Sequence, residues 1–210
     1  MFRSILRRSG RVASPTMVVL AGLCFALPFV TVSCDTPGGF GRAAPGATIT
    51  YTGIDLAVGG QPDVSPPDKV RAGNGADRLP PQPAAIIVLL LLVAATGVAV
   101  ARVDPRTRRA SVTVLAGFAA AGALINQALV EAELRLRVAE QVSQPLPADK
   151  SVRDFVHTGT GFVVCLLLLV LVAAANALGW WRGRRGSADA ANPANPELAS
   201  PVDPEPASST

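Results

Sequence analysis

An uncharged stretch near the end of the chain, from Gly161 to Gly179, limits the possible folds more than any other feature. An α-helix rises about 1.5 Å per residue, so this stretch is long enough to cross a hydrocarbon layer about 30 Å thick. Two tryptophans and a cluster of arginines follow it, at 180–185. Aromatic residues favour the membrane interface and arginines favour the cytoplasmic side. The stretch is therefore predicted to span a membrane, with Gly179 at its cytoplasmic end.

The composition agrees with a membrane protein. Half of the 210 residues are apolar and only 16% are charged, fewer than in an ordinary soluble domain. The net charge of +4 does not indicate nucleic-acid binding, because the arginines flank apolar runs instead of lining one face. Arginine greatly outnumbers lysine and alanine is abundant, which indicates a high-GC bacterial genome.

Three further apolar runs complete a predicted all-α fold, a four-helix transmembrane bundle with a small extracytoplasmic cap and a disordered C-terminal tail. The arginines at 106–109 and the basic N-terminus put both chain ends in the cytoplasm. The predicted segments are a basic N-terminus at 1–11, spans at 12–33, 83–103, 111–130 and 155–181, an extracytoplasmic loop at 34–82, a cytoplasmic loop at 104–110, an extracytoplasmic helical extension and loop at 131–154, and the tail at 182–210.

The first apolar run has a basic start, as a signal peptide does, but it is longer than the usual core of a signal. We therefore expect a retained helix. Pro28 lies inside the run and lacks a backbone donor, so it is predicted to bend or end the helix near Leu27.

Short elements are predicted in the cap. The segment 47–52 alternates β-branched residues and is predicted to be a strand, whereas Gly53–Val58 fits either a second strand or one helical turn. The third span is predicted to continue outward as a helix over 131–142. There, Glu131 with Arg135 and Glu133 with Arg137 have the spacing of stabilising ion pairs.

The three cysteines form no Cys-x-x-Cys motif. Cys24 and Cys165 are expected at similar depth in the membrane, where a thiol usually behaves as a small apolar group. Cys34 has an alternative role. The sequence Thr31-Val32-Ser33-Cys34 is similar to a lipoprotein acylation site, and cleavage there would leave three spans with unchanged orientation.

Ionisable residues are sparse in the predicted spans, which disfavours a transporter unless a partner subunit supplies the pathway. At the outer interface, Cys34, Glu131, Asp154 and His157 could together bind a metal ion or handle a proton, but no ligand spacing supports such a site. No cofactor is expected. Gly159-Thr160-Gly161 is interpreted as a packing feature, because it lacks the lysine of a phosphate loop.

Two segments carry a resemblance to a known group. Leu27-Pro28-Phe29 leads to Ser33-Cys34 at the end of the first helix, and residues 52–59 read Thr-Gly-Ile-Asp-Leu-Ala-Val-Gly. Both are similar to segments of small, uncharacterised bacterial inner-membrane proteins with about four helices. The resemblance implies a multi-pass inner-membrane protein and implies no activity.

The leading functional hypothesis is a non-enzymatic protein whose cap contacts another membrane or envelope protein. Tyr51, Ile54 and Leu56 are the candidate contact residues. An enzymatic or metal-binding site at the outer interface, a lipoprotein acylated at Cys34, and a small transporter subunit are the alternatives. The predicted partners are the lipid bilayer and that second protein.

Overall fold

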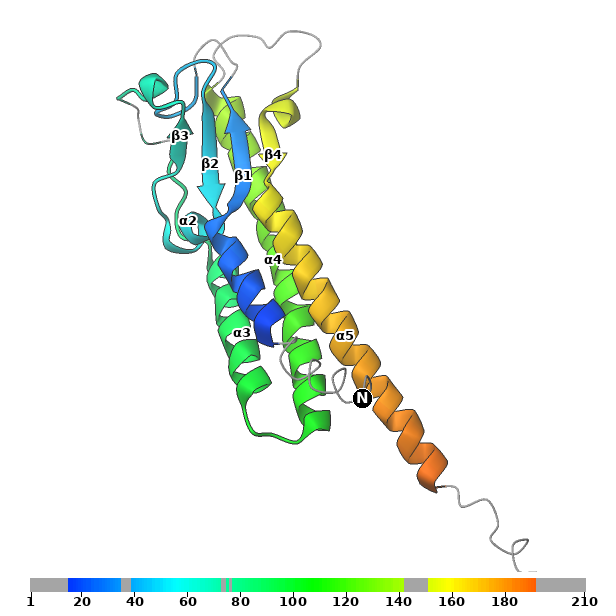
Figure 1. The fold of residues 1–210 in the computed structure, drawn as a ribbon. Helices are drawn as coiled ribbons and strands as arrows, with labels where there is room; N and C mark the ends of the chain where they lie inside the picture. Colours follow the sequence, from blue (N-terminus) through cyan, green and yellow to red (C-terminus); the bar gives the residue numbers. More distant parts are fainter. Residues whose placement is uncertain (1–14, 35–38, 73–74, 76, 142–150, 192–210) are drawn as a thin grey trace, which may run out of the picture.

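Three long helices dominate the computed structural model, which describes residues 15–34, 39–72, 75, 77–141 and 151–191. They are α3 (Pro83–Val100), α4 (Pro105–Gln141) and α5 (Thr160–Ala191). In the described part of the chain, these three are long and apolar enough to cross a membrane. α4 packs against both α3 and α5 (Figure 1). The helices support the prediction of a multi-pass membrane protein.

The first apolar run is not one helix. A shorter apolar helix covers Pro15–Ala26, and its last turn, η1 (Cys24–Ala26), is a 3₁₀-helix. Leu27 has extended backbone angles, and the chain continues as strand β1 (Pro28–Ser33). The helix thus ends where the position of Pro28 indicated. Residues 28–33, however, form a strand and are not part of the helical span predicted at 12–33. Proline removes a helical donor, and the β-branched residues that follow it favour a strand.

A four-stranded antiparallel sheet forms the core of the cap. Its strands are β1, β2 (Thr48–Thr52), β3 (Asp63–Ser65) and β4 (Val156–Thr158), in the order β3-β2-β1-β4. The strand predicted at 47–52 is confirmed as β2. Gly53–Val58 is helical and forms α2.

The fourth apolar run also begins later than predicted. Phe155 ends the 3₁₀-helix η3 (Val152–Phe155), β4 follows, and α5 begins at Thr160. β4 pairs with the central strand β1, so the start of the predicted span at 155–181 belongs to the sheet. At the other end, α5 continues to Ala191, so the first part of the predicted disordered tail is helical.

α4 is longer than a membrane span, and its outer part runs beside the sheet (Figure 1). The predicted extension beyond residue 130 is confirmed as far as Gln141. Both predicted ion pairs form, at 2.8 Å for Glu131–Arg135 and 2.5 Å for Glu133–Arg137. The predicted N-terminus at 1–11, residues 142–150 of the predicted outer loop, and the tail beyond Ala191 lie outside the described residues.

Polar contacts mark both ends of the apolar helix segments. At one end, Arg109 Nη1 donates to the carbonyl oxygen of Gly179 at 3.1 Å. At the other, Thr158 Oγ1 donates to Glu131 Oε1 at 2.7 Å. Along α4 these two levels are separated by about 33 Å, since the helix rises about 1.5 Å per residue. That separation matches a hydrocarbon layer of about 30 Å.

Candidate functional site

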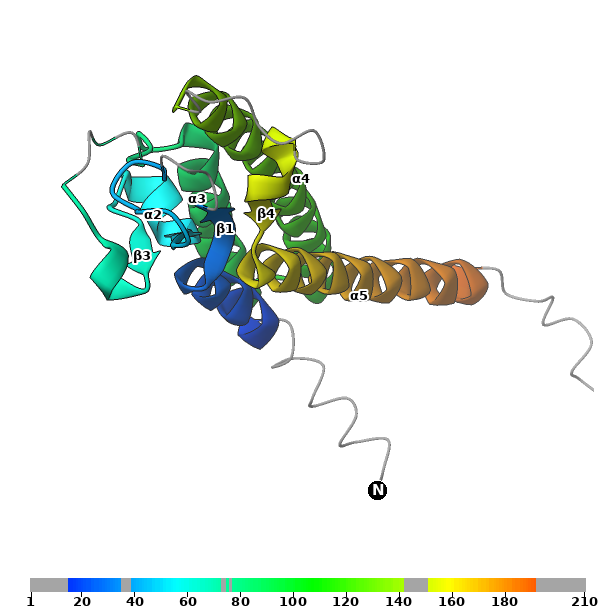
Figure 2. The same cartoon turned by 90° about the horizontal axis from the view of Figure 1, so that it is seen from above.

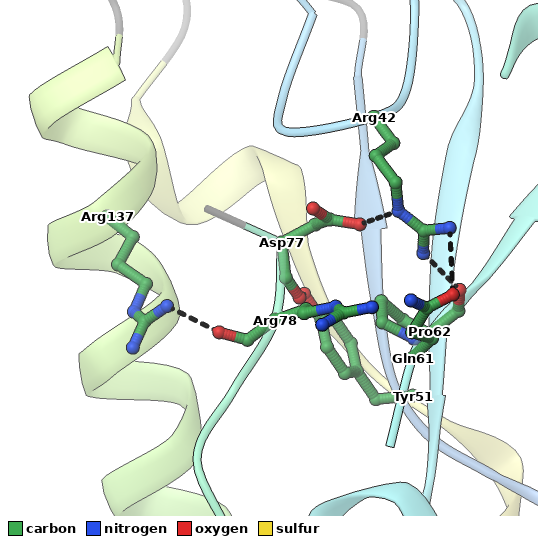
Figure 3. Close-up of polar contacts among 7 residues, drawn as sticks. All are labelled: Arg42, Tyr51, Gln61, Pro62, Asp77, Arg78 and Arg137. Atoms are coloured by element: carbon green, nitrogen blue, oxygen red, sulfur yellow. Dashed lines mark hydrogen bonds and ion pairs between the residues drawn. The ribbon is translucent and has the colours of Figure 1, made fainter. Parts of the chain in front are cut away.

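The most connected polar cluster of the cap surrounds Asp77, which is 0% exposed. Arg42 Nε lies 2.7 Å from Asp77 Oδ2, and Arg42 Nη2 donates to the carbonyl oxygen of Pro62 at 2.9 Å. Gln61 lies beside the guanidinium groups of both Arg42 and Arg78 (Figure 3). A carboxylate removed from water needs a charged partner, and Arg42 supplies it.

The backbone next to this carboxylate is held from two further elements. The Tyr51 hydroxyl, from β2, donates to the carbonyl oxygen of Asp77 at 2.5 Å. Arg137 Nη1, from α4, donates to the carbonyl oxygen of Arg78 at 2.7 Å (Figure 3). Burial raises the pKa of Tyr51, and the negative charge of Asp77 raises it further. We call the contacts among Arg42, Tyr51, Asp77, Arg78 and Arg137 the clamp.

A glycine makes room for the clamp. Gly41 has φ +56°, a conformation that L-residues rarely adopt, and a Cβ at this position would lie 2.5 Å from the Cβ of Asp77. The loop of Arg42 can therefore pass close to Asp77 only with glycine at this position.

The clamp continues into a second contact with the long helices. Arg137 also pairs with Glu133, whose Oε2 accepts from Gln82 Nε2 at 3.1 Å. Gln82 immediately precedes α3, and its backbone N–H donates to the carbonyl oxygen of Leu56, in α2, at 2.8 Å. The cap is thus fixed both to the outer part of α4 and to the start of α3.

Residues of the segment 52–59 have structural roles. Thr52 and Asp55 form a capping box at the start of α2, and Gly59, with φ +73°, ends the helix. A Cβ at Gly53 would lie 2.7 Å from the Phe25 ring, so glycine permits α2 to pack on the first helix. This segment seats α2 at the junction between the cap and the helices.

The structure separates the three predicted contact residues. Tyr51 and Leu56 are buried inside the cap, so they are not available as a surface for a partner. Ile54 is 47% exposed. Tyr51 and Leu56 belong to the hydrophobic core instead.

The outer-interface residues do not meet at one site. Cys34 is buried, and its backbone pairs with Ala47 and Gly46. Asp154 caps η3, while His157 is exposed on β4. Among the residues that the structure describes, no group of three or more His, Cys, Asp or Glu side chains could hold a metal ion.

Glu131, the fourth of these residues, serves the junction between α4 and the sheet. Its carboxylate accepts from Thr158 Oγ1, from Gln127 Nε2 at 2.8 Å and from Arg135 Nη2 at 2.8 Å. The contact with Thr158 joins β4 to α4, and the other two lie within α4. They use both carboxylate oxygens and give Glu131 a structural role.

All three cysteines are described and buried, and none of them forms a disulfide. Cys165 Sγ donates weakly to the carbonyl oxygen of Ala21 at 3.5 Å, which places this thiol where α5 meets the first helix. Cys34 Sγ lies 3.8 Å from the carbonyl oxygen of Val32. If the chain were cleaved before Cys34, it would lose the first helix and β1, the strand that pairs with both β2 and β4.

The glycines before and within α5 confirm the packing interpretation. The N–H of Gly159 donates to the carbonyl oxygen of Phe29 at 2.7 Å. A Cβ at Gly159 would overlap the backbone of Pro28, and one at Gly161 would lie 2.7 Å from the carbonyl oxygen of Pro28. Both glycines let the chain cross β1 closely.

An apolar groove with a volume of about 220 Å³ lies between the first helix and α3. Thr96 contributes a hydroxyl to its wall, but that hydroxyl donates to the carbonyl oxygen of Leu92 at 2.8 Å. The groove therefore offers apolar packing and no group suited to acid–base or nucleophilic chemistry. Its lining residues are Val18, Val19, Gly22, Leu89, Leu92, Val93 and Thr96.

The exposed rim of the cap consists of β3, η2 (Pro67–Lys69) and Val70. Ser65, Pro66, Asp68 and Val70 are exposed on it, and β3 is an edge strand. We call this surface the rim.

Sequence reasoning missed the clamp. Its members from the cap loops lie within the Gly- and Pro-rich extracytoplasmic loop predicted at 34–82, and Arg42 and Asp77 are 35 residues apart in the chain. Charged residues that lie far apart in a loop give no local pairing pattern, so the sequence carried no signal that joined Arg42 to Asp77. Comparisons with known protein families, with curated proteins and with solved structures found no match for this chain.

Proposed function

We propose that this chain is a multi-pass membrane protein of the bacterial inner membrane that presents its cap as a rigid binding surface for another envelope protein. The clamp is the observation that carries this proposal. It joins the loops of the cap to the outer part of α4, a helix that also enters the membrane-spanning bundle. A surface held in this way loses little conformational entropy when a partner binds.

The polar groups of the cap support a binding role over a catalytic one. Arg42 and Asp77 neutralise each other, Glu133 pairs with Arg137, and Glu131 is occupied by three donors. A catalytic acid or base needs access to substrate. The carboxylate of Asp77 is instead buried and paired with Arg42, so its role is to hold the cap together.

The rim is the surface that we assign to the partner. Val70 is an exposed apolar side chain there, next to the exposed Asp68 and the charged Lys69. Protein interfaces place apolar side chains at their centre and polar side chains around them, which is the arrangement that we assign to Val70, Asp68 and Lys69. Ile54 lies nearer the long helices than the rim does, because it is on α2, which packs against η1 and α3. We therefore move the predicted contact surface from Tyr51, Ile54 and Leu56 to the rim.

The orientation follows from the charges at the two ends of the bundle. The first turns of α4 carry Arg106, Arg108 and Arg109, and Arg182 lies at the end of the apolar part of α5. The positive-inside rule places these residues in the cytoplasm and the cap outside. Assignment to the group of small inner-membrane proteins that the sequence resembles is part of the same proposal, and it adds no activity.

Site-specific photo-crosslinking in native membranes tests the binding role. A photoreactive residue is placed at Val70 and at Asp68 in the full chain, with Arg153, exposed beside β4, as the control position. Both rim positions should yield one defined protein adduct that the control lacks. A Val70→Asp variant with an unchanged melting temperature should reduce the adduct at position 68 about tenfold. Equal labelling at all positions, or no adduct at the rim of a folded protein, would overturn the proposal.

A further inference from the structure

An apolar stripe runs along the face of α4 that points away from the rest of the molecule. It consists of Ile125, Leu129, Ala132, Leu136 and Ala139, which are all exposed. Figure 2 shows α4 at the edge of the molecule. The side chains that α4 buries against the described protein lie on the opposite face and include Val112, Ala123, Val130, Leu134 and Val138. We call the exposed set the outer stripe.

Lipid can cover only part of the outer stripe. Ile125 and Leu129 precede Glu131, where the polar contacts mark the end of the apolar bundle. Leu136 lies about 7.5 Å further along the helix axis, beside the Glu131–Arg135 and Glu133–Arg137 ion pairs. Leu136 is nevertheless 67% exposed. Covering this large aliphatic side chain with another apolar surface would therefore be favourable.

The spacing of the outer stripe specifies what kind of surface fits. Its residues follow one another at alternating intervals of four and three, the pattern of a coiled-coil seam. Leu129 and Leu136 then occupy one type of seam position, and Ala132 and Ala139 the other. Two copies inserted in one membrane have the same orientation, so their α4 helices can pair only in parallel.

The charges beside the seam fit that parallel pairing. In a parallel coiled coil, a residue just before one seam position faces the residue five places further along the partner helix. Arg135 lies just before the seam residue Leu136, so it faces Glu140 of the second copy. Among the described residues, Glu140 forms no ion pair within its own chain. The twofold axis repeats the Arg135–Glu140 contact on both sides of the interface.

We propose that two copies of this protein pair in parallel along the outer stripe of α4, with Leu136 of each copy at the interface outside the hydrocarbon layer. The pairing continues from this level into the membrane through Leu129 and Ile125. It rests on the membrane placement proposed above, but it does not depend on the binding role of the rim.

Disulfide crosslinking in native membranes tests the pairing directly. Leu136→Cys should form a disulfide-linked dimer under mild oxidation, because seam residues of a parallel pair face each other. Asp63→Cys, exposed on β3, is the control for chance collisions, and the unaltered chain controls for its native cysteines, which are at most 7% exposed. A dimer yield for Leu136→Cys no higher than for Asp63→Cys would overturn the proposal.

Charge reversal tests the register. In the Leu136→Cys background, Glu140→Arg should lower the association constant of the dimer about tenfold. The change replaces the two Arg135–Glu140 attractions between the copies with two repulsions. Adding Arg135→Glu should restore at least half of the crosslinking. Thermal unfolding checks that each variant is folded. Failure of the second change to restore the dimer, or crosslinking of Leu136→Cys to a different protein instead of itself, would refute the pairing while leaving the rim assignment untouched.

Discussion

The hydroxyl of Tyr51 donates a 2.5 Å hydrogen bond to the backbone carbonyl oxygen of Asp77. The two residues come from β2 and from the chain that leads into α3, and Arg42 and Arg137 extend the contact to a loop and to α4. The cap of this protein is therefore held by polar contacts between distant segments in addition to its sheet. Its stability should respond to single changes at these residues.

Replacing Arg42 with alanine should destabilise the cap. The variant leaves the Asp77 carboxylate buried without its charged partner, and removing one member of such a pair costs about 3 kcal/mol. The loss of cap stability is measured by thermal unfolding in detergent, with proteolysis of the cap as the readout. Arg153→Ala, at an exposed position, should have little effect. Equal effects of the two substitutions would contradict the structural role of the clamp.

Tyr51 should link cap stability to alkaline pH. Burial raises its pKa above the ordinary value of about 10, so the folded state holds the phenolic proton more tightly than the unfolded state does. The corresponding stability is fully present below pH 10 and is lost as pH rises through the folded pKa. Tyr51 is the only tyrosine, so its absorbance near 295 nm reports the titration directly.

The folded protein should therefore show no tyrosinate signal near pH 10, and the signal should appear together with unfolding at higher pH. A Tyr51→Phe variant should lose about 1 kcal/mol with the hydrogen bond and should lack this component of the pH dependence. A normal titration of Tyr51 in the folded protein would show that its hydroxyl is accessible.

Gly161→Ala should disturb the crossing of α5 over β1. The added Cβ would lie 2.7 Å from both Leu27 Cβ and the carbonyl oxygen of Pro28. Overpacking of this kind costs about 1–3 kcal/mol. Gly97→Ala on α3 is the matched control, because no atom lies within 4 Å of its added Cβ. Thermal unfolding of both variants should show a loss for position 161 alone.

The mature protein should retain its first helix. Cleavage before Cys34 would remove β1, and β2 and β4 would lose their shared partner. Intact mass measurement of the protein from native membranes should therefore include residues 1–33 and show no acyl group on Cys34. A mass that corresponds to a lipidated chain beginning at Cys34 would establish the lipoprotein alternative.

The two ends of the bundle should differ in accessibility. A membrane-impermeant maleimide should label Ser65→Cys in intact cells from which the outer membrane has been removed. It should label Thr107→Cys only after the inner membrane is permeabilised. Both positions are exposed, so the difference reports topology. The reverse labelling pattern would invert the orientation inferred from the arginines.

The local sequence predicted the elements whose pattern is complete within a short segment. The length and apolarity of the runs that became α3, α4 and α5 indicated membrane helices, and β2 followed from its alternating residues. The Glu131–Arg135 pair was likewise visible, because residues four apart on a helix are neighbours. The position of Pro28 correctly indicated where the first helix ends.

The strands β1 and β4 were not predicted because each adjoins an apolar run that was interpreted as a membrane helix. Val30 and Val156 fit a membrane span as well as a sheet, and only the pairing of these distant segments makes them strands. The burial of Tyr51 and Leu56 also depends on which elements cover them. An apolar side chain favours burial away from water, but its identity does not indicate whether the protein core, a partner or lipid buries it.

The sequence by itself determined that this chain has membrane-length apolar helices, because the cost of placing charges in lipid restricts the composition of each segment separately. The tertiary structure alone decided that Arg42 meets Asp77, that β1 joins β2 to β4, and that α4 supports the cap. Those contacts join residues far apart in the chain. Bringing such residues together costs chain entropy, and only the folded structure as a whole offsets that cost.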